Sequence, residues 1–189
     1  MPREGVFAKV VHEGNIAVGD EMEVLVRFRA AIVTLSDKGA EGKREDKSGT
    51  LIKELLENDG YVVDAQTLLP DNKKAIEETL IEFSDRLKVD LILTTGGTGF
   101  SPRDVMPEAT LAVADRLAPG FAEVMRMESL KVTNRAMLSR AAAVLRKRTL
   151  IINMPGSPKA VRECFAAIAP AIPHGVEVLR GDANECATT

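Results

Sequence analysis

The sequence predicts an α/β fold: a doubly wound, mostly parallel sheet flanked by helices, with a small β-rich appendage at the N-terminus. Three observations support this prediction. From Arg29 onward, short apolar runs of strand length alternate with runs whose apolar residues recur at helical spacing, as in a parallel sheet with crossover helices. This strand-then-helix unit occurs four times, with loops of a few residues. The length of 189 residues suits one domain with at most a small addition.

The first two units cover the first half of the domain. The run AAIVTL over 30–35 ends in the turn-forming cluster SDKG, so it predicts a buried strand that leads into a loop. The leucines and isoleucine of 51–56 share one helical face, and Gly60 predicts the end of that helix. A second strand is expected over 61–68. Apolar residues spaced at helical period over 76–87 then predict an amphipathic helix.

The third and fourth units complete the sheet. The run DLILTT over 90–95 predicts a strand that leads directly into glycines. Pro107, followed by an acidic residue, predicts the start of a helix. Another helix is expected over 119–130, which opens with a proline. The last clear strand is TLIIN over 149–153, and Ser157 begins a helix that extends to about residue 168.

The two ends of the chain do not follow this scheme. Residues 1–27 contain two short β-like runs, and a two-strand piece is not stable alone, so it must lie on the main domain or on a partner. We expect the main domain to span 28–181. Residues 182–189 are small and polar and predict a flexible tail.

Composition excludes several classes of function. A net charge of −3, with six Phe, one Tyr and no Trp, argues against a nucleic-acid-binding protein. The two cysteines form no CxxC pair, and no signal peptide or membrane-length apolar run is present, so we expect a cytoplasmic protein. The two histidines lie far apart, and Cys164 lies on a periodic apolar face. The stretch 126–148 is rich in Arg and Lys, which indicates either a solvated face or an anion site.

The most informative loop is TTGGTG over 94–99, which follows the third strand. In doubly wound domains ligands bind at the carboxyl ends of the strands. Three glycines there allow backbone N–H groups to converge on an anion, although a plain strand-to-loop turn would also use them. The loop matches neither a P-loop nor a dinucleotide-binding fingerprint.

Two carboxylates at strand ends predict a magnesium site. Arg103 can pair with a phosphate in a bidentate fork, and Asp104 beside it can hold a hard cation. Asp71 follows the second strand, and Mg²⁺ is usually held by one or two carboxylates together with phosphates and water. The alternatives are a surface pair between Arg103 and Asp104, and a helix-capping role for Asp71.

The last strand leads into MPGSPK, in which Ser157 is a good helix cap with proline after it. A helix N-terminus beside a Gly-Ser turn is also an anion site, so both interpretations stay open. Ser36 and Asp37, in the loop after the first strand, have the same ambiguity.

From about Arg29 to Gly181 the sequence resembles the molybdopterin adenylyltransferase family of molybdenum cofactor biosynthesis, of the MogA and MoaB type. The resemblance depends on TLSDKGAEGKREDKSG, LLPDN, LILTTGGTGFSPRDVMPEAT, APGFAEVMR, MLSRA and IINMPGSPKAV, in the order and spacing of the family. The glycine loop is shared with molybdenum insertase domains and CinA-type proteins. The PGF and LSR stretches favour the adenylyltransferase branch.

The resemblance implies an enzyme that transfers AMP from ATP to the terminal phosphate of molybdopterin, with Mg²⁺ and release of pyrophosphate. It implies a homotrimer and a molybdenum insertase as a partner, and it makes Asp71 and Asp104 the catalytic, metal-holding residues. The nucleophile is itself an ionised phosphate, so no Ser, His or Cys base is required. With the loop residues above, the expected substrate-binding residues are Ser36, Asp37, Thr95, Gly96, Gly97, Thr98, Gly99, Arg103, Ser139, Arg140, Pro155, Gly156 and Ser157.

Two alternative functions stay open: a carrier that binds molybdopterin without catalysis, and a CinA-like nucleotide pyrophosphatase. Met106 departs from the resemblance, because the family usually has Thr there. A Thr could cap a helix that starts at Pro107, and its loss predicts a cost of about 1 kcal/mol. Residues 1–27 resemble the closing strands of a MOSC domain, which implies a truncated fusion without that module's cysteine-bearing core.

Overall fold

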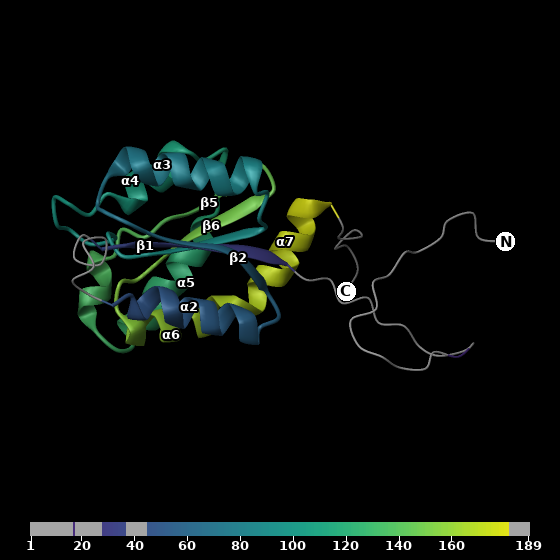
Figure 1. The fold of residues 1–189 in the computed structure, drawn as a ribbon. Coiled ribbons are helices and arrows are strands. Elements are labelled where there is room, and N and C mark those ends of the chain that lie inside the picture. The colour runs from purple at the N-terminus through teal and green to yellow at the C-terminus, as the bar shows by residue number, and fades with distance from the viewer. Residues whose placement is uncertain (1–16, 18–27, 37–44, 182–189) are drawn as a thin grey trace.

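The computed structural model describes residue 17, residues 28–36 and residues 45–181. Six strands form one sheet in the order β2-β1-β3-β6-β5-β4 (Figure 1). The four strands β2, β1, β3 and β6 are mutually parallel, while β5 is antiparallel to β6, and β4 is antiparallel to β5. The strands are β1 (Arg29–Leu35), β2 (Val62–Leu69), β3 (Leu91–Thr95), β4 (Arg116–Leu117), β5 (Ala143–Arg146) and β6 (Thr149–Met154).

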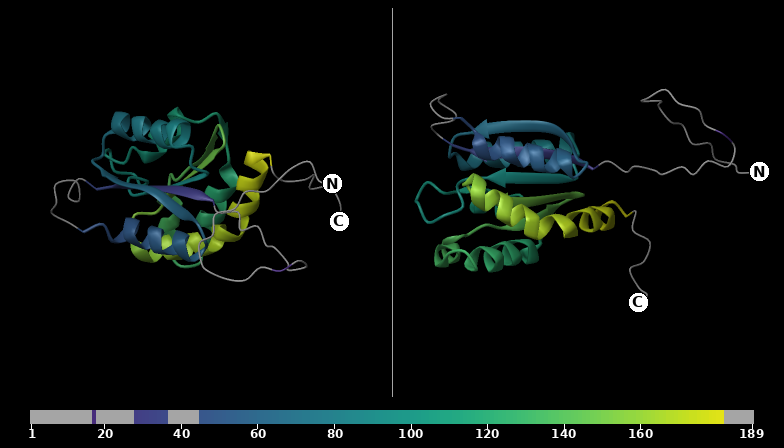
Figure 2. Two further views of the ribbon diagram at one scale, coloured as in Figure 1. Left: turned by 45° about the vertical axis from the view of Figure 1, so that its right-hand side comes forward. Right: turned by 90° about the horizontal axis from the view of Figure 1, so that it is seen from below.

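Helices cover both faces of this sheet. α3 and α4 lie on one face, and α2, α5 and α6 lie on the other, with α7 at its end (Figures 1 and 2). The helices are α2 (Lys47–Asn58), α3 (Lys73–Ile81), α4 (Met106–Ala112), α5 (Pro119–Leu130), α6 (Pro158–Ile168) and α7 (Ile172–Arg180). The predicted doubly wound, mostly parallel α/β fold is therefore confirmed.

The core has two layers because successive strand residues point to opposite faces. In β1, Ala30 and Ile32 pack against α2, α6 and α7, whereas Ala31 and Val33 pack toward α3 and α4. Every apolar residue of β1 is buried. Continuous apolar runs rather than alternating ones are what a parallel strand covered on both faces requires.

The predicted elements from 30 to 168 agree with the structure to within a few residues. Gly60 follows the C-cap residue Asp59 and has φ +84°, a conformation that glycine adopts without strain. The periodic run over 76–87 is α3 followed by a π-helical turn, Glu82–Arg86. Sequence analysis did not predict the antiparallel strands β4 and β5, or α7.

The expectation for Met106 is wrong. The helix begins at Met106 itself and its N-cap is Val105, so residue 106 does not occupy the capping position. The Met106 side chain is fully buried in the core layer between the sheet and the two helices α3 and α4. Its backbone N–H donates to the carbonyl oxygen of Gly97 at 3.2 Å, so this position fixes the glycine loop to α4 by packing and a backbone hydrogen bond.

Several expectations fall on residues that the structure does not describe. These are the β extension over 1–27, of which only Ala17 is described, the tail over 182–189, and Asp37. The domain boundaries at 28 and 181 therefore stay predictions. Within the described residues, none of the helices is both long and apolar enough to span a membrane.

Candidate active site

Those predicted site residues that the structure describes meet at the carboxyl edge of the sheet. The strand register places Thr34 of β1 beside Thr95 of β3, and Thr95 beside Met154 of β6. The loops after these strands therefore leave the sheet at one level. β1 and β3 flank the point at which the strand order reverses, which is where doubly wound folds bind ligands.

The glycine loop lies directly against the end of β1. Gly96 has φ +91° and Gly97 has φ +64°. A Cβ atom on Gly96 would lie 2.6 Å from the carbonyl oxygen of Leu35, which is closer than van der Waals contact permits. Glycine is thus required at position 96 for close approach as well as for backbone conformation. Gly156 lies on the other side of this loop, where a Cβ atom would lie 3.5 Å from the Cα of Gly96, an ordinary van der Waals contact.

Hydroxyl groups tie the three loops together. Thr95 Oγ1 donates to the carbonyl oxygen of Pro155 at 2.7 Å, and Ser48 Oγ donates to that of Gly156 at 2.8 Å. Thr95 is fully buried. Its side chain therefore joins β3 to the turn after β6, which makes it a residue that holds the site in shape.

A first cavity of about 140 Å³ opens between β1, the N-terminus of α2 and the glycine loop. Four of the predicted substrate-binding residues line it, namely Ser36, Thr95, Gly96 and Gly156, and so do three residues that sequence analysis missed: Thr34, Asp46 and Ser48. The Thr34 hydroxyl is buried and has no hydrogen-bond partner among the described residues. A buried hydroxyl without a partner is unfavourable, so it is a candidate for contact with a ligand.

Asp46 forms the N-cap of α2, where its carboxylate accepts from the backbone N–H of Gly49 at 2.7 Å. A Cβ atom on Gly49 would lie 2.1 Å from that carboxylate and 2.5 Å from Thr34 Oγ1. Glycine therefore lets α2 start close to the end of β1. The sequence signal was the acidic residue before KSG, which is typical of a helix cap.

A second cavity of about 280 Å³ lies on the other side of the glycine loop. Thr98, Gly99, Ser139 and Pro155 line it, together with Arg126 and Arg135 from the basic stretch. Arg126 is held in place by donating to the carbonyl oxygen of Ala141 at 3.0 Å. The two arginines make this a wall that favours an anion. Cys164 lines the same cavity and is buried, as expected of a core residue.

Asp71 does not cap the following helix. The N-cap of α3 is Asn72, whose side chain accepts from the backbone N–H of Ala75 at 3.1 Å. Burial raises the pKa of the Asp71 carboxyl, and the charge of Asp104 raises it further. Two carboxylates from different loops are thus close enough to repel each other, and a cation between them would relieve this repulsion.

The Asp104 side chain is fixed by its own loop. One of its oxygens accepts from the backbone N–H of Ser101 at 2.9 Å. Among the described residues, Arg103 forms an ion pair with Asp71 at 3.5 Å, and not the pair with Asp104 that the alternative had proposed. The Arg103 side chain is 65% exposed, so its guanidinium can turn toward a phosphate.

The donor set suits Mg²⁺ that arrives with a phosphate. No group of three potential metal-ligating His, Cys, Asp or Glu side chains occurs in the described part of the chain. Mg²⁺ in phosphate-handling sites is usually held by one or two carboxylates, with substrate phosphates and water as the other ligands. Asp71 and Asp104 fit that role.

Arg140 braces the loops that carry the site. Its side chain donates to the carbonyl oxygens of Gly99 at 2.7 Å and Asp104 at 2.5 Å, and it also pairs with Glu108. Burial is the largest single influence and raises the pKa of Glu108, but the hydrogen bond and charge of Arg140, a backbone hydrogen bond and the charge of Lys73 together outweigh it, so the net direction is downward. Sequence analysis assigned Arg140 to substrate binding, whereas its hydrogen bonds here go to the protein.

The predicted anion site at α6 has the expected local structure. Ser157 is the N-cap, where its hydroxyl accepts from the backbone N–H of Ala160 at 3.3 Å, and Pro158 follows. The N-terminus of α6 therefore directly follows the turn that contains Gly156, and this turn lies against Gly96. Asp37 lies outside the described residues.

Comparison with known proteins shows which family of proteins this chain resembles. The family described as "Probable molybdopterin binding domain" matches residues 31–174. The molybdopterin adenylyltransferase of Helicobacter pylori J99 is 43% identical over 155 residues, which cover 80% of this chain and 87% of that protein. The Escherichia coli K12 molybdopterin adenylyltransferase is 41% identical over 156 residues, with 79% and 80% covered.

A solved structure agrees with both. The molybdopterin biosynthesis enzyme MoaB from Thermus thermophilus superimposes with a TM-score of 0.77 at 47% identity, and the match covers 82% of this chain and 97% of that one. Residues 31–174, which the family model matches, contain the glycine loop, both carboxylates and the turn before α6. The chain therefore belongs to the molybdopterin adenylyltransferase family of molybdenum cofactor biosynthesis.

Proposed function

We propose that this protein is a molybdopterin adenylyltransferase, which transfers AMP from ATP to the terminal phosphate of molybdopterin and releases pyrophosphate. The observation that carries the proposal is the pair Asp71 and Asp104, placed beside a glycine loop with a cavity on either side. Two anionic substrates need two sites that meet at one metal-binding edge. The names of the relatives support the same reaction.

The chain's own residues would position the substrates and balance their charge. An oxygen of the molybdopterin phosphate forms a bond to the α-phosphorus of ATP, the bond from that phosphorus to the bridging oxygen breaks, and pyrophosphate leaves with its electron pair. Asp71 and Asp104 would hold Mg²⁺, which when bound neutralises charge on the phosphates. Backbone N–H groups of the glycine loop and the N-terminus of α6 would orient the phosphates. Catalysis then rests on alignment and electrostatic stabilisation.

The direct test is to incubate the full chain with ATP, Mg²⁺ and molybdopterin, and to quantify adenylylated molybdopterin and pyrophosphate. We expect equal amounts of the two products. A carrier would give neither product, and isothermal titration would show no Mg²⁺-dependent binding of ATP. A nucleotide pyrophosphatase would act on the nucleotide without any pterin. Either result would overturn the proposal.

We expect Mg²⁺ binding to tighten as pH rises through the mildly acidic range. The raised pKa of Asp71 means that the native protein binds this proton more tightly than the unfolded chain does. Between the ordinary carboxyl pKa of about 4 and the raised value, the free energy of unfolding of the metal-free protein therefore falls as pH rises. Mg²⁺ competes with the same proton, so its stabilising effect grows over that window.

Thermal unfolding from pH 4 upward, with and without MgCl₂ and a non-hydrolysable ATP analogue, measures this effect. The Asp71→Asn variant carries no titrating group at that position and serves as the control. The same pH dependence of the Mg²⁺ effect in wild type and variant would contradict the assignment.

Replacing Arg140 by lysine is expected to slow adenylyl transfer by about tenfold to a hundredfold, because lysine keeps the charge but cannot bridge Gly99, Asp104 and Glu108 at once. Arg162→Lys, an exposed position on α6, is the matched control. Initial rates at saturating substrate and Mg²⁺ measure the effect. An unchanged rate in Arg140→Lys would show that the contacts of Arg140 with Gly99, Asp104 and Glu108 are dispensable for adenylyl transfer.

The apolar surface of α5 supports the homotrimer that the family resemblance implies. Val124, Met127 and Leu130 are 40%, 64% and 45% exposed, and Leu117 of β4 is 65% exposed. Apolar side chains gathered in this way are typical of surfaces that a second chain covers. We propose that copies of this chain cover them, and light scattering after size-exclusion chromatography tests the trimer. A molybdenum insertase that accepts the product is proposed from the resemblance alone, and co-purification tests it.

A further inference from the structure

A larger cavity lies at the opposite edge of the sheet, where β3 and β6 begin. Its volume is about 650 Å³. Its wall includes Ser84 from the π-helical turn, Lys88 and Asp90 before β3, Lys147 and Arg148 between β5 and β6, and Arg180 at the end of α7. β3 has five residues, so about 16 Å of strand separates this cavity from the glycine loop.

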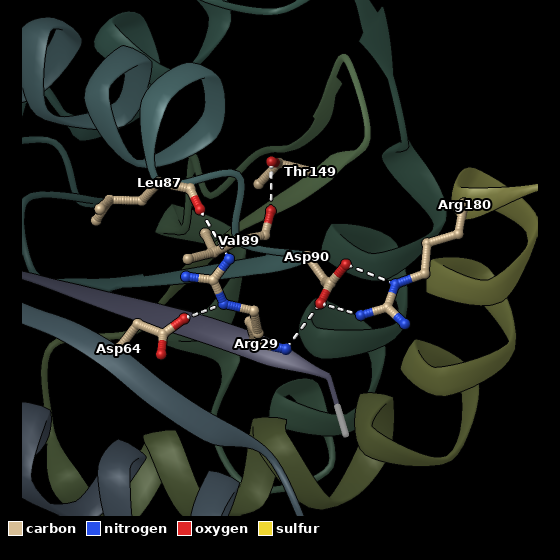
Figure 3. Close-up of polar contacts among 7 residues, drawn as sticks. All are labelled: Arg29, Asp64, Leu87, Val89, Asp90, Thr149 and Arg180. Carbon is tan, nitrogen blue, oxygen red and sulfur yellow. Dashed lines mark hydrogen bonds and ion pairs between the residues drawn. The ribbon is translucent and has the colours of Figure 1, made fainter. Parts of the chain in front are cut away.

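The wall of this amino-edge cavity carries more positive than negative charge. One of its carboxylates, Asp90, is fully engaged: it accepts from Arg180 at 2.7 and 2.6 Å and from the backbone N–H of Arg29 at 2.7 Å (Figure 3). The other, Asp85, is paired with Arg146 at 2.7 Å and with Lys147 at 2.8 Å.

Two cations on the wall are not used by these pairs. Within the described ranges, neither Lys88 nor Arg148 forms a salt bridge. Both residues lie in or next to backbone of unusual conformation. Lys88 has φ +55° two residues after the π-helical turn, and Lys147 has φ +51° in the two-residue turn that it forms with Arg148. A tight hairpin turn of this kind fixes the backbone position from which the Arg148 side chain leaves.

Ser84 gives a second, independent observation. Its side chain is 3% exposed, and its hydroxyl has no hydrogen-bond partner among the described residues. A hydroxyl can donate to a phosphate oxygen. A π-helical turn is an uncommon element that is frequently found at functional sites, and here it places Ser84 on the same wall as Lys88.

We propose that the amino-edge cavity binds a phosphate-bearing small molecule, at a site separate from the glycine loop. The volume lies in the range of small-molecule pockets. The unpaired cations supply charge, and Ser84 supplies a neutral donor. The basic stretch over 126–148 is thereby divided: Arg126 and Arg135 serve the carboxyl edge, whereas Arg146, Lys147 and Arg148 belong to the amino edge.

Pyrophosphate titration of the full, ¹⁵N-labelled chain tests this site, because two-dimensional NMR follows each edge separately. We expect saturable shifts of the backbone amides of 84–90 and 147–149, distinct from those of 96–99. In the Lys88→Ala/Arg148→Ala variant, the dissociation constant at the amino edge should rise at least about tenfold, while that at the glycine loop stays the same. Lys74→Ala, an exposed position on α3, is the control and should change neither.

Ser84→Ala separates a binding role from a structural one. If the hydroxyl serves a ligand, the variant binds pyrophosphate more weakly but melts at the same or a higher temperature, because it loses an unsatisfied buried group. The proposal is overturned if the amino-edge shifts do not saturate, if NaCl at matched ionic strength reproduces them, or if the double variant leaves them unchanged. None of these outcomes bears on adenylyl transfer, which is measured at the other edge.

Discussion

Replacing Asp104 by asparagine should lower the rate of adenylyl transfer by about a hundredfold to a thousandfold, the range found when one group that stabilises charge in the transition state is removed. Asparagine keeps the shape and can still accept the hydrogen bond from Ser101. The loop should therefore fold as before, and the loss would report on the negative charge alone. In the proposed reaction that charge holds the Mg²⁺ on which the phosphates are aligned.

The experiment measures kcat and the Mg²⁺ concentration at half-maximal rate for Asp104→Asn, with Asp59→Asn as the matched control. Asp59 is an exposed residue at the C-terminal end of α2, far along the helix from the site. We expect the control to match the wild type, and Asp104→Asn to need more Mg²⁺ as well as to react slowly. Wild-type kinetics in Asp104→Asn would show that the Asp104 carboxylate does not hold the metal.

Gly96→Ala is expected to destabilise the fold by about 3 kcal/mol and to abolish activity. Two effects add: a non-glycine residue at φ +91° costs about 1 kcal/mol or more, and the new methyl group would lie 2.6 Å from the carbonyl oxygen of Leu35. Relief of that clash would move the glycine loop away from β1, and with it the N–H groups proposed to hold a phosphate.

Urea unfolding measures the stability change, and Gly175→Ala provides the comparison. Gly175 lies inside α7, where a new methyl group would have no neighbouring atom within 4 Å and φ is not positive, so alanine there should be neutral or stabilising by up to about 1 kcal/mol. If both variants unfolded at the same urea concentration, the close approach at Gly96 would not matter to stability.

The four parallel strands were predictable because each is followed by a turn signal, and because β1, β3 and β6 are also buried apolar runs, whereas the edge strand β2 has no buried residue. β5 was not, because its sequence AVLR is short and its turn, Lys147-Arg148, has no glycine or asparagine. Its pairing with β6 decides that it is a strand. α7 contains Pro173 and Gly175, which argue against a helix in isolation, yet Pro173 falls in the first turn, where proline is tolerated.

The candidate site, like the fold, contains some residues that the local sequence predicts and others that only the tertiary structure shows. Asp71 and Asp104 could be predicted because they follow strands that end at one edge of the sheet. Thr34 could not, since a threonine within an apolar strand gives no signal until α2 packs beside it and leaves its hydroxyl without a partner. Thr95 and Arg140 were recognised as site residues, but their protein partners, Pro155 and Gly99, are contacts across the fold.

Asp90 joins residues from the two ends of the domain. Arg29, at the start of β1, and Arg180, at the end of α7, both donate to its carboxylate, and the Arg180 guanidinium lies 4.9 Å from the ring centroid of Phe28. The described domain thus begins and ends at one place, on the edge opposite the glycine loop. Circular permutants that join residues 28 and 181 by a short linker should therefore fold, and proteins fused at either end would leave the mouth of the active site open.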